Sequence, residues 1–163
     1  MIDSVVSLQD NELFGTLTEQ EMSRLTPFCA PFVAIEDAVL FAEGRQASHL
    51  YLVTEGRIAL QKAVRPRHGT HSRRTTVTVC YPGDVVGWSA LVEPYQYTLF
   101  AVAWESSRLI SIDAKPLRRT LATYPEMGYR VMRALSEVMS RRLKQTTDVL
   151  INERQGLLGG LKE

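Results

Sequence analysis

The middle of the chain, from about residue 31 to residue 113, consists of short apolar runs separated by turn signals. Threonine and valine alternate through residues 75–80, which is the two-residue period of a β-strand. Glycine follows glutamate at Gly44 and Gly56, and such pairs punctuate the runs. Short strands with no long helix between them predict an antiparallel sandwich or barrel. The expected strands lie near residues 32–35, 39–41, 49–53, 57–61, 75–80, 97–103 and 107–112.

Helical patterns flank this β region on both sides. Near the amino terminus, Thr18 and Glu21 have the spacing of a capping box, in which each side chain bonds the other residue's backbone N–H. After the last strand, Asp113 is expected to cap a helix that runs to residue 123. Pro125 suits the first position of another helix. The chain is therefore predicted to be mainly β with flanking helices.

The last helix is expected to be long, from residue 124 to residue 155. Such a helix would span about 45 Å, more than a small β domain needs. Apolar residues recur along it at helical spacing, so one side can pack on the β region and another can meet a partner helix. The expected partner is a second copy of the chain, in a homodimer. The predicted dimer seam consists of Met132, Leu135, Met139, Arg142, Thr146 and Val149.

These patterns divide the chain into three parts: a β domain with its amino-terminal helix at residues 12–123, the long helix at residues 124–155, and a glycine-rich flexible tail at residues 156–163. The chain has 163 residues, 45% of them hydrophobic and 23% charged, which is typical of an ordinary soluble globular protein. Its net charge of +1 provides no general attraction to nucleic acid or membrane. No signal peptide or membrane-spanning run is visible, so a cytoplasmic protein without a membrane partner is expected.

Few residues suggest catalysis, redox chemistry or metal binding. Cys29 and Cys80 lie in apolar surroundings and are expected to be buried free thiols. No nucleophile-elbow or P-loop motif occurs, so enzyme activity is not expected. His68 and His71 have no third ligand nearby in sequence, so no metal site is expected. They belong to a charged run at residues 62–74, interpreted as a solvated hairpin loop, with an acidic partner or nucleic-acid backbone as the alternative.

Residues 83–101 have an order of elements that can bind an anion. Two valines lead into Gly87, a short helical turn is expected at residues 89–91, and a strand starts near Tyr97. A helix start leaves several backbone N–H groups without partners inside the helix. Such groups are suited to hold a negatively charged ligand.

Four segments carry a recognisable pattern, at residues 40–44 (LFAEG), 50–58 (LYLVTEGRI), 81–87 (YPGDVVG) and 109–113 (LISID). They resemble the cyclic nucleotide-binding domain, in particular the sensory half of the catabolite-activator/FNR superfamily of bacterial regulators. The similarity covers roughly residues 12–155. It implies a jelly-roll-like β-roll with a small amino-terminal helical part and a long carboxy-terminal helix that dimerises.

The resemblance also implies where a ligand would bind. In nucleotide-binding members, a Gly-Glu pair at the Gly87 position starts the phosphate-binding cassette, and a later arginine pairs with the cyclic phosphate. Here Trp88 stands in place of the glutamate and Tyr97 in place of the arginine, while Thr98 keeps the following hydroxyl. The loss of that arginine removes a charge-assisted contact.

On the long helix, Thr146 and Thr147 match a hydroxyl pair that meets the adenine ring in the catabolite activator. Their hydroxyls can instead bond back to carbonyls of the same helix. The candidate ligand-binding residues are therefore Val86, Gly87, Trp88, Ser89, Ala90, Tyr97, Thr98, Arg142, Thr146 and Thr147.

Three functions remain open from the sequence. The first is a stand-alone regulatory module that senses a small ligand or contacts a signalling protein, with a cyclic nucleotide or another small molecule as the candidate ligand and no certain cofactor. The second is a functional receptor for cyclic AMP or cyclic GMP, and the third is a ligand-free scaffold. Trp88 and Tyr97 can either fill the pocket or line it for a flat ligand. Few residues follow Gln155, so no helix-turn-helix and no direct sequence-specific DNA binding is expected.

Overall fold

The computed structural model describes residues 8, 10–64 and 73–159. The loop around His68 and His71 lies outside the described residues. The predictions made for it, which are a solvated hairpin, an acidic partner and no metal site, therefore also concern residues outside the described range. Residues 160–163 of the predicted tail also lie outside.

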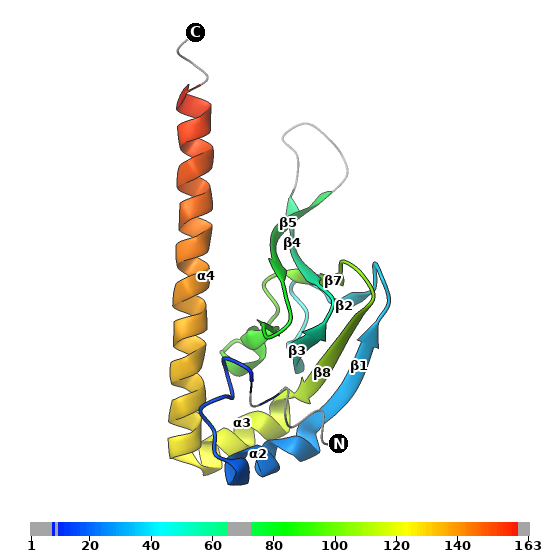
Figure 1. The fold of residues 1–163 in the computed structure, drawn as a ribbon, viewed down its shortest axis with the longest axis vertical. Coiled ribbons are helices and arrows are strands. Elements are labelled where there is room, and N and C mark those ends of the chain that lie inside the picture. Colours follow the sequence, from blue (N-terminus) through cyan, green and yellow to red (C-terminus); the bar gives the residue numbers. More distant parts are fainter. Residues whose placement is uncertain (1–7, 9, 65–72, 160–163) are drawn as a thin grey trace.

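Two four-stranded antiparallel sheets form the β-roll (Figure 1). The first has the order β1-β8-β3-β6, with β1 at Cys29–Ala34, β8 at Ser107–Asp113, β3 at His49–Glu55 and β6 at Val85–Val86. The second has the order β2-β7-β4-β5, with β2 at Val39–Phe41, β7 at Phe100–Ala103, β4 at Ile58–Val64 and β5 at Arg73–Cys80. These sheets and the flanking helices confirm the predicted fold class.

The first sheet is covered on both faces, which explains why β3 is almost continuously apolar in sequence. Leu50 and Leu52 belong to the core cluster formed with the helices. Tyr51 and Val53 belong to a second cluster, which lies between the two sheets. Successive side chains of a strand point to opposite faces, so alternate residues of β3 enter the two cores.

Short-range capping sets the start of two helices, as predicted. Thr18 Oγ1 accepts a hydrogen bond from Glu21 N, and the Glu21 carboxylate accepts one from Thr18 N at 2.9 Å, which starts α2 (Glu19–Leu25). A 3₁₀ turn, η1 (Thr26–Phe28), leads from α2 into β1. Asp113 accepts from Lys115 N at 3.0 Å and starts α3 (Ala114–Thr123).

The long helix α4 (Pro125–Gly159) stands beside the β-roll and projects past it (Figure 1). It begins in close contact with α3, because a Cβ at Gly128 would lie only 2.6 Å from the carbonyl oxygen of Leu121. It continues to Gly159, whereas the helix was expected to end at residue 155 and a flexible tail to follow. Gly156 disfavours a helix by only about 1 kcal/mol, so one glycine is not enough to end it.

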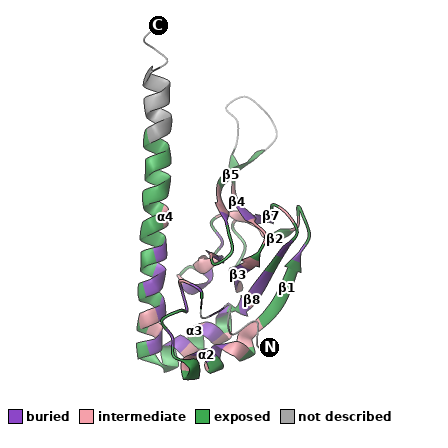
Figure 2. Cartoon of the chain, viewed as in Figure 1, coloured by how far each residue is buried: buried purple, intermediate pink, exposed green. Residues whose placement is uncertain are grey.

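Only the first half of α4 is buried by the rest of the chain (Figure 2). Met127, Val131 and Val138 pack into the described chain, and residues 143–151 are all exposed. Leu135 was expected in the dimer seam but is 1% exposed and lies in the chain's own core. The helix therefore uses one stripe to hold the β-roll and leaves another uncovered.

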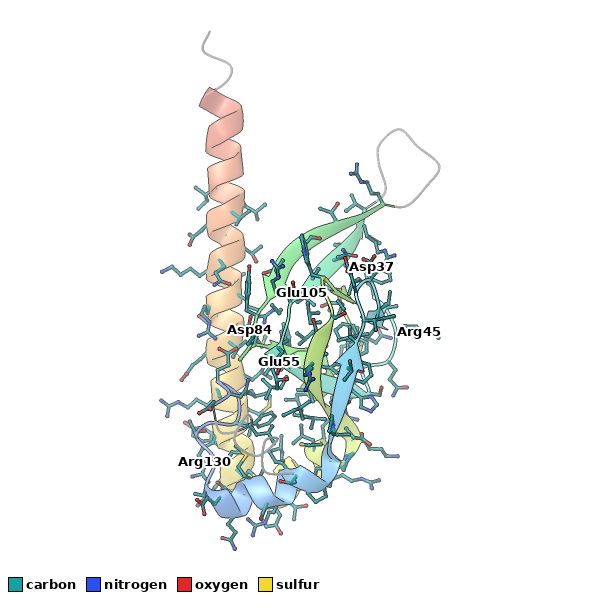
Figure 3. The ribbon with its side chains drawn as sticks, turned by 45° about the vertical axis from the view of Figure 1, so that its right-hand side comes forward. Asp37, Arg45, Glu55, Asp84, Glu105 and Arg130 are labelled. Carbon is teal, nitrogen blue, oxygen red and sulfur yellow. The ribbon has the colours of Figure 1, made fainter. Side chains whose placement is uncertain are left out.

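Two ion pairs attach the amino-terminal segment to α4. Arg130 pairs with Glu21 of α2, and Arg141 pairs with Glu12. Figure 3 shows Arg130 at the base of the molecule, beside α2. Together with the core contacts, these pairs hold the first half of α4 in a defined position.

Candidate functional site

The predicted cassette is formed by β6, Gly87 and the short 3₁₀ helix η2 (Trp88–Leu91). Gly87 has φ of +81°, a conformation that favours glycine. An added Cβ would lie 3.0 Å from the His49 carbonyl oxygen and 3.2 Å from both the Phe41 and Tyr97 rings. Gly87 is therefore required both by its backbone conformation and by the close approach of β3 and two aromatic rings.

Tyr97 closes the space next to Gly87. Its ring stacks on Phe41 with centroids 3.8 Å apart and planes 9° from parallel. Its hydroxyl donates to the His49 carbonyl oxygen at 2.8 Å and accepts from His49 N at 3.2 Å. The side chain is buried, with 5% exposed, and fully occupied by contacts within the chain.

The other predicted cassette residues serve mainly packing. Val86 and Ala90 are completely buried, Val86 between the sheets and Ala90 in the cluster formed with the helices. Trp88 is half-buried and packs against the same helix-side cluster, and Ser89 is half-buried. Trp88 and Tyr97 thus both contribute to the hydrophobic core.

Two arginines from the helices hold the cassette at its two ends. Arg142 of α4 donates to the carbonyl oxygen of Val85 at 3.1 Å and to Cys80 Sγ at 3.4 Å. Arg118 of α3 donates to the carbonyl oxygen of Ala90 at 2.6 Å and lies over the Tyr95 ring, 4.2 Å from its centroid. Any displacement of the cassette would disturb a contact with each helix.

The predicted hydroxyl contacts are not gathered at the cassette. Thr98 is exposed, and its carbonyl oxygen accepts from Lys62 Nζ at 3.2 Å. Thr146 and Thr147 are exposed on α4, where their hydroxyls donate to the carbonyl oxygens of Arg142 and Leu143, each at 2.9 Å. The structure thus places Tyr97 beside Gly87 and Arg142 on the carbonyl of Val85, and it leaves the three threonines at the surface.

Burial keeps the tyrosines and cysteines around the cassette neutral near neutral pH. It raises the pKa of Tyr97 above its ordinary value and that of Tyr51 to about 12. It also raises the pKa of Cys29 to about 11 and that of Cys80 above its usual range, with both thiols free. Tyr97 is therefore a neutral phenol, which supplies no positive charge beside Gly87.

Three residues of this region were not singled out from the sequence: Phe41, His49 and Arg118. Phe41 lies inside the LFAEG segment, where Gly44 indicates a turn but no local pattern indicates the contacts of the Phe41 ring. His49 acts through its backbone N and O, which no sequence pattern reveals. Arg118 reaches Ala90 across 28 positions, so no local spacing could indicate the contact.

Two surface hollows of the described part of the chain lie on α4, and neither is lined by residues 85–91 of the cassette. One lies at the start of α4 around Tyr129, and the other lies between α4 and the end of β5. Within the described residues, no group of three or more His, Cys, Asp and Glu side chains is placed to hold a metal ion. No described helix combines the length and the apolar character needed to cross a membrane.

Comparison with known proteins places this geometry in context. Residues 34–124 match the sequence profile of the family described as the cyclic nucleotide-binding domain. A CRP-like cAMP-activated global transcriptional regulator of Mycobacterium tuberculosis is 25% identical over 138 residues, which are 85% of this chain and 58% of that protein. The chain therefore spans less than two thirds of that regulator's length.

Solved structures show the same architecture. The N-terminal domain of a transcriptional regulator from Streptomyces coelicolor has a TM-score of 0.65 at 26% identity, covering 88% of this chain and 94% of that one. A cyclic nucleotide-binding domain from Methylobacillus flagellatus has a TM-score of 0.78 at 18% identity, covering 93% and 84%. At that identity the second likeness concerns the fold alone.

Proposed function

We propose that this chain, which belongs to the cyclic nucleotide-binding domain family, is a regulatory module whose cassette is closed by its own aromatic side chains. Its output is contact with another protein, in the first place a second copy of itself. It does not act by binding a cyclic phosphate at Gly87. The fully bonded, buried Tyr97 carries this proposal.

Charge supports the closed cassette. A cyclic phosphate needs a cation or several free donors to replace its water. Tyr97 uses its hydroxyl on His49, and Arg118 and Arg142 use donors on cassette carbonyls. A nucleotide would have to displace the stack of Tyr97 on Phe41 before it reached the N–H groups after Gly87.

An uncovered stripe on α4 supports the dimer. With Leu135 buried and Arg142 turned to the β-roll, the exposed face has a spacing of alternately four and three residues, as in a coiled coil. Leu143 is 70% exposed and Leu150 57% exposed, which is unusual for leucine on a monomer surface. This outer stripe consists of Met132, Ser136, Met139, Leu143, Thr146 and Leu150.

The alternative is a working cyclic nucleotide receptor, since the Mycobacterium tuberculosis relative is described as activated by cAMP. Isothermal titration calorimetry of the full chain with cyclic AMP and with cyclic GMP separates the two. The closed cassette predicts no saturable heat with either nucleotide. Binding with a Kd at or below about 100 µM would support the receptor and reject the closed cassette.

A further inference from the structure

A polar hollow of about 420 Å³ lies where α4 separates from the β-roll. Its walls come from three places: α4, the end of β5 with the turn that follows it, and the amino-terminal segment. Figure 3 shows Asp84 of that turn beside α4. We call this hollow the wedge. Its polar lining includes Glu12, Tyr81, Asp84, Arg141, Arg142 and Gln145.

The wedge has hydrogen-bonding capacity that the described chain does not use. The Arg142 guanidinium contacts Cys80 Sγ and the Val85 carbonyl oxygen, and it has no carboxylate partner among the described residues. A guanidinium has five N–H donors, so some of them remain available. Glu12 pairs with Arg141 through one oxygen, while its other oxygen is buried and has no hydrogen-bond partner among the residues that the structure describes.

Charges of opposite sign from different elements line the wedge. Arg142 approaches from α4, and Asp84 approaches from the turn, where it accepts a hydrogen bond from Tyr81 N at 2.8 Å. The two side chains form no ion pair with each other. The lining contains two arginines and two carboxylates, so its formal charge is balanced.

The balanced charge of the wedge lining favours a ligand that itself carries one positive and one negative charge. A ligand with several negative charges would be repelled by Glu12 and Asp84, and an apolar ligand would strip water from all the charged groups without replacing it. A small zwitterion places one charge against each wall. We propose that the wedge binds a free amino acid or a closely related zwitterion, with its carboxylate on Arg142 and its ammonium group between Asp84 and Glu12. This site lies outside Gly87 and η2, shares with the cassette only the arginine that holds Val85, and goes beyond the proposed function.

The position of Arg142 gives such binding a consequence. The same guanidinium holds the Val85 carbonyl, two residues before Gly87. A carboxylate on Arg142 would compete for its donors and weaken that contact. Occupancy of the wedge would thereby alter how α4 holds the cassette, which is a direct path from a ligand to the dimer helix.

The test is a thermal-shift screen of the full chain against each standard L-amino acid, followed by calorimetry on those that raise the melting temperature. At least one should bind saturably. Asp84→Asn and Arg142→Gln should each weaken that binding by about tenfold or more, because each removes a charge from a charge-assisted hydrogen bond. Arg133→Gln, on the solvent side of the same helix, removes a charge elsewhere and should leave the affinity unchanged.

The ligand can be tested from its own side as well. The methyl ester of the amino acid that binds lacks the negative charge, and the N-acetyl form lacks the positive charge, so both should bind more weakly. Circular dichroism checks that the variants fold, and Asp84→Asn decides the case if Arg142→Gln does not. The proposal is overturned if no amino acid binds the wild-type chain, or if Asp84→Asn binds as tightly as Arg133→Gln. Neither result depends on whether cyclic nucleotides bind at the cassette.

Discussion

Tyr97 is the residue that decides what the space beside Gly87 can hold. Arginine at this place would offer charge and several donors to a phosphate. Tyrosine offers a ring that fills space against Phe41 and a single hydroxyl, which His49 uses twice. The Tyr97 side chain therefore fills the space beside Gly87 with packed contacts.

Tyr97→Phe should lower the free energy of unfolding by about 1–2 kcal/mol, because it removes two hydrogen bonds and leaves the His49 carbonyl oxygen without its donor. Urea denaturation followed by circular dichroism measures the difference. Tyr129→Phe is the matched control, since Tyr129 is an exposed residue of α4, and it should change stability little. Equal effects of the two substitutions would show that the Tyr97 hydroxyl does not hold the cassette.

At the scale of elements, η2 and the residues before it are held in place by side chains from outside the segment. Three residues outside the segment from Val85 to Ala90 contact it: Tyr97 next to Gly87, Arg118 of α3 at Ala90 and Arg142 of α4 at Val85. A four-residue 3₁₀ helix has little stability of its own. Its position is therefore decided by these contacts, which makes it a suitable element to respond to movement of α3 or α4.

The capping box of α2 gives a pH-dependent prediction. Glu21 has a pKa below its ordinary value of 4.5, chiefly because it accepts a hydrogen bond from the Thr18 backbone, with further help from the Thr18 hydroxyl and from Arg130. The unfolded chain thus binds the proton more readily than the folded one. The stability from Glu21 is fully present above its unfolded pKa and is lost as the pH falls through the lower folded pKa.

Glu21→Gln should therefore destabilise the protein by about 1 kcal/mol at pH 7, and the difference from wild type should shrink towards about pH 3. Urea denaturation at both pH values measures it. Glu19→Gln, in the same helical turn but outside the capping box, is the control for the loss of a charge. If the difference in unfolding free energy between the wild type and Glu21→Gln is the same at both pH values, the ionised Glu21 carboxylate is not its source.

At the scale of the whole molecule, α4 has two stripes of side chains, one that packs on the β-roll and one that the described chain leaves uncovered. The stripe through Met127, Val131 and Val138 completes the core of the β-roll. The outer stripe continues past the roll, where nothing in the described chain covers it. A helix that extends beyond its own domain with exposed leucines is suited to pair with a copy of itself.

The double variant Leu143→Glu with Leu150→Glu should be monomeric where the wild type is dimeric, because like charges would face each other along the seam. Light scattering coupled to size-exclusion chromatography measures the mass. The double variant Arg133→Gln with Lys144→Gln changes the net charge equally at exposed positions of α4 outside the outer stripe and should stay dimeric. A wild-type chain that is monomeric at all concentrations would reject the dimer.

Much of the fold could be predicted because it depends on short-range patterns. The capping residues Thr18 and Asp113 act within three positions of themselves, and alternation through residues 75–80 depends on neighbours along one strand. The strand expected from Tyr97 starts only at Phe100, since Tyr97 pairs its backbone with Arg45. Local periodicity cannot show that a distant segment competes for the same backbone groups.

The contacts of the candidate site depend on the tertiary structure far more than the secondary-structure elements do. The sequence alone determined that a glycine-led turn and a short helix would follow the two valines of β6, and that Tyr97 would bring an aromatic ring without a charge to this region. Only the tertiary structure decided that Tyr97 bonds His49, 48 positions away, and that Arg142 turns inward to Cys80 and Val85. Backbone conformation follows from neighbouring residues, whereas filling a pocket requires surfaces from strands and helices that meet only in the folded chain.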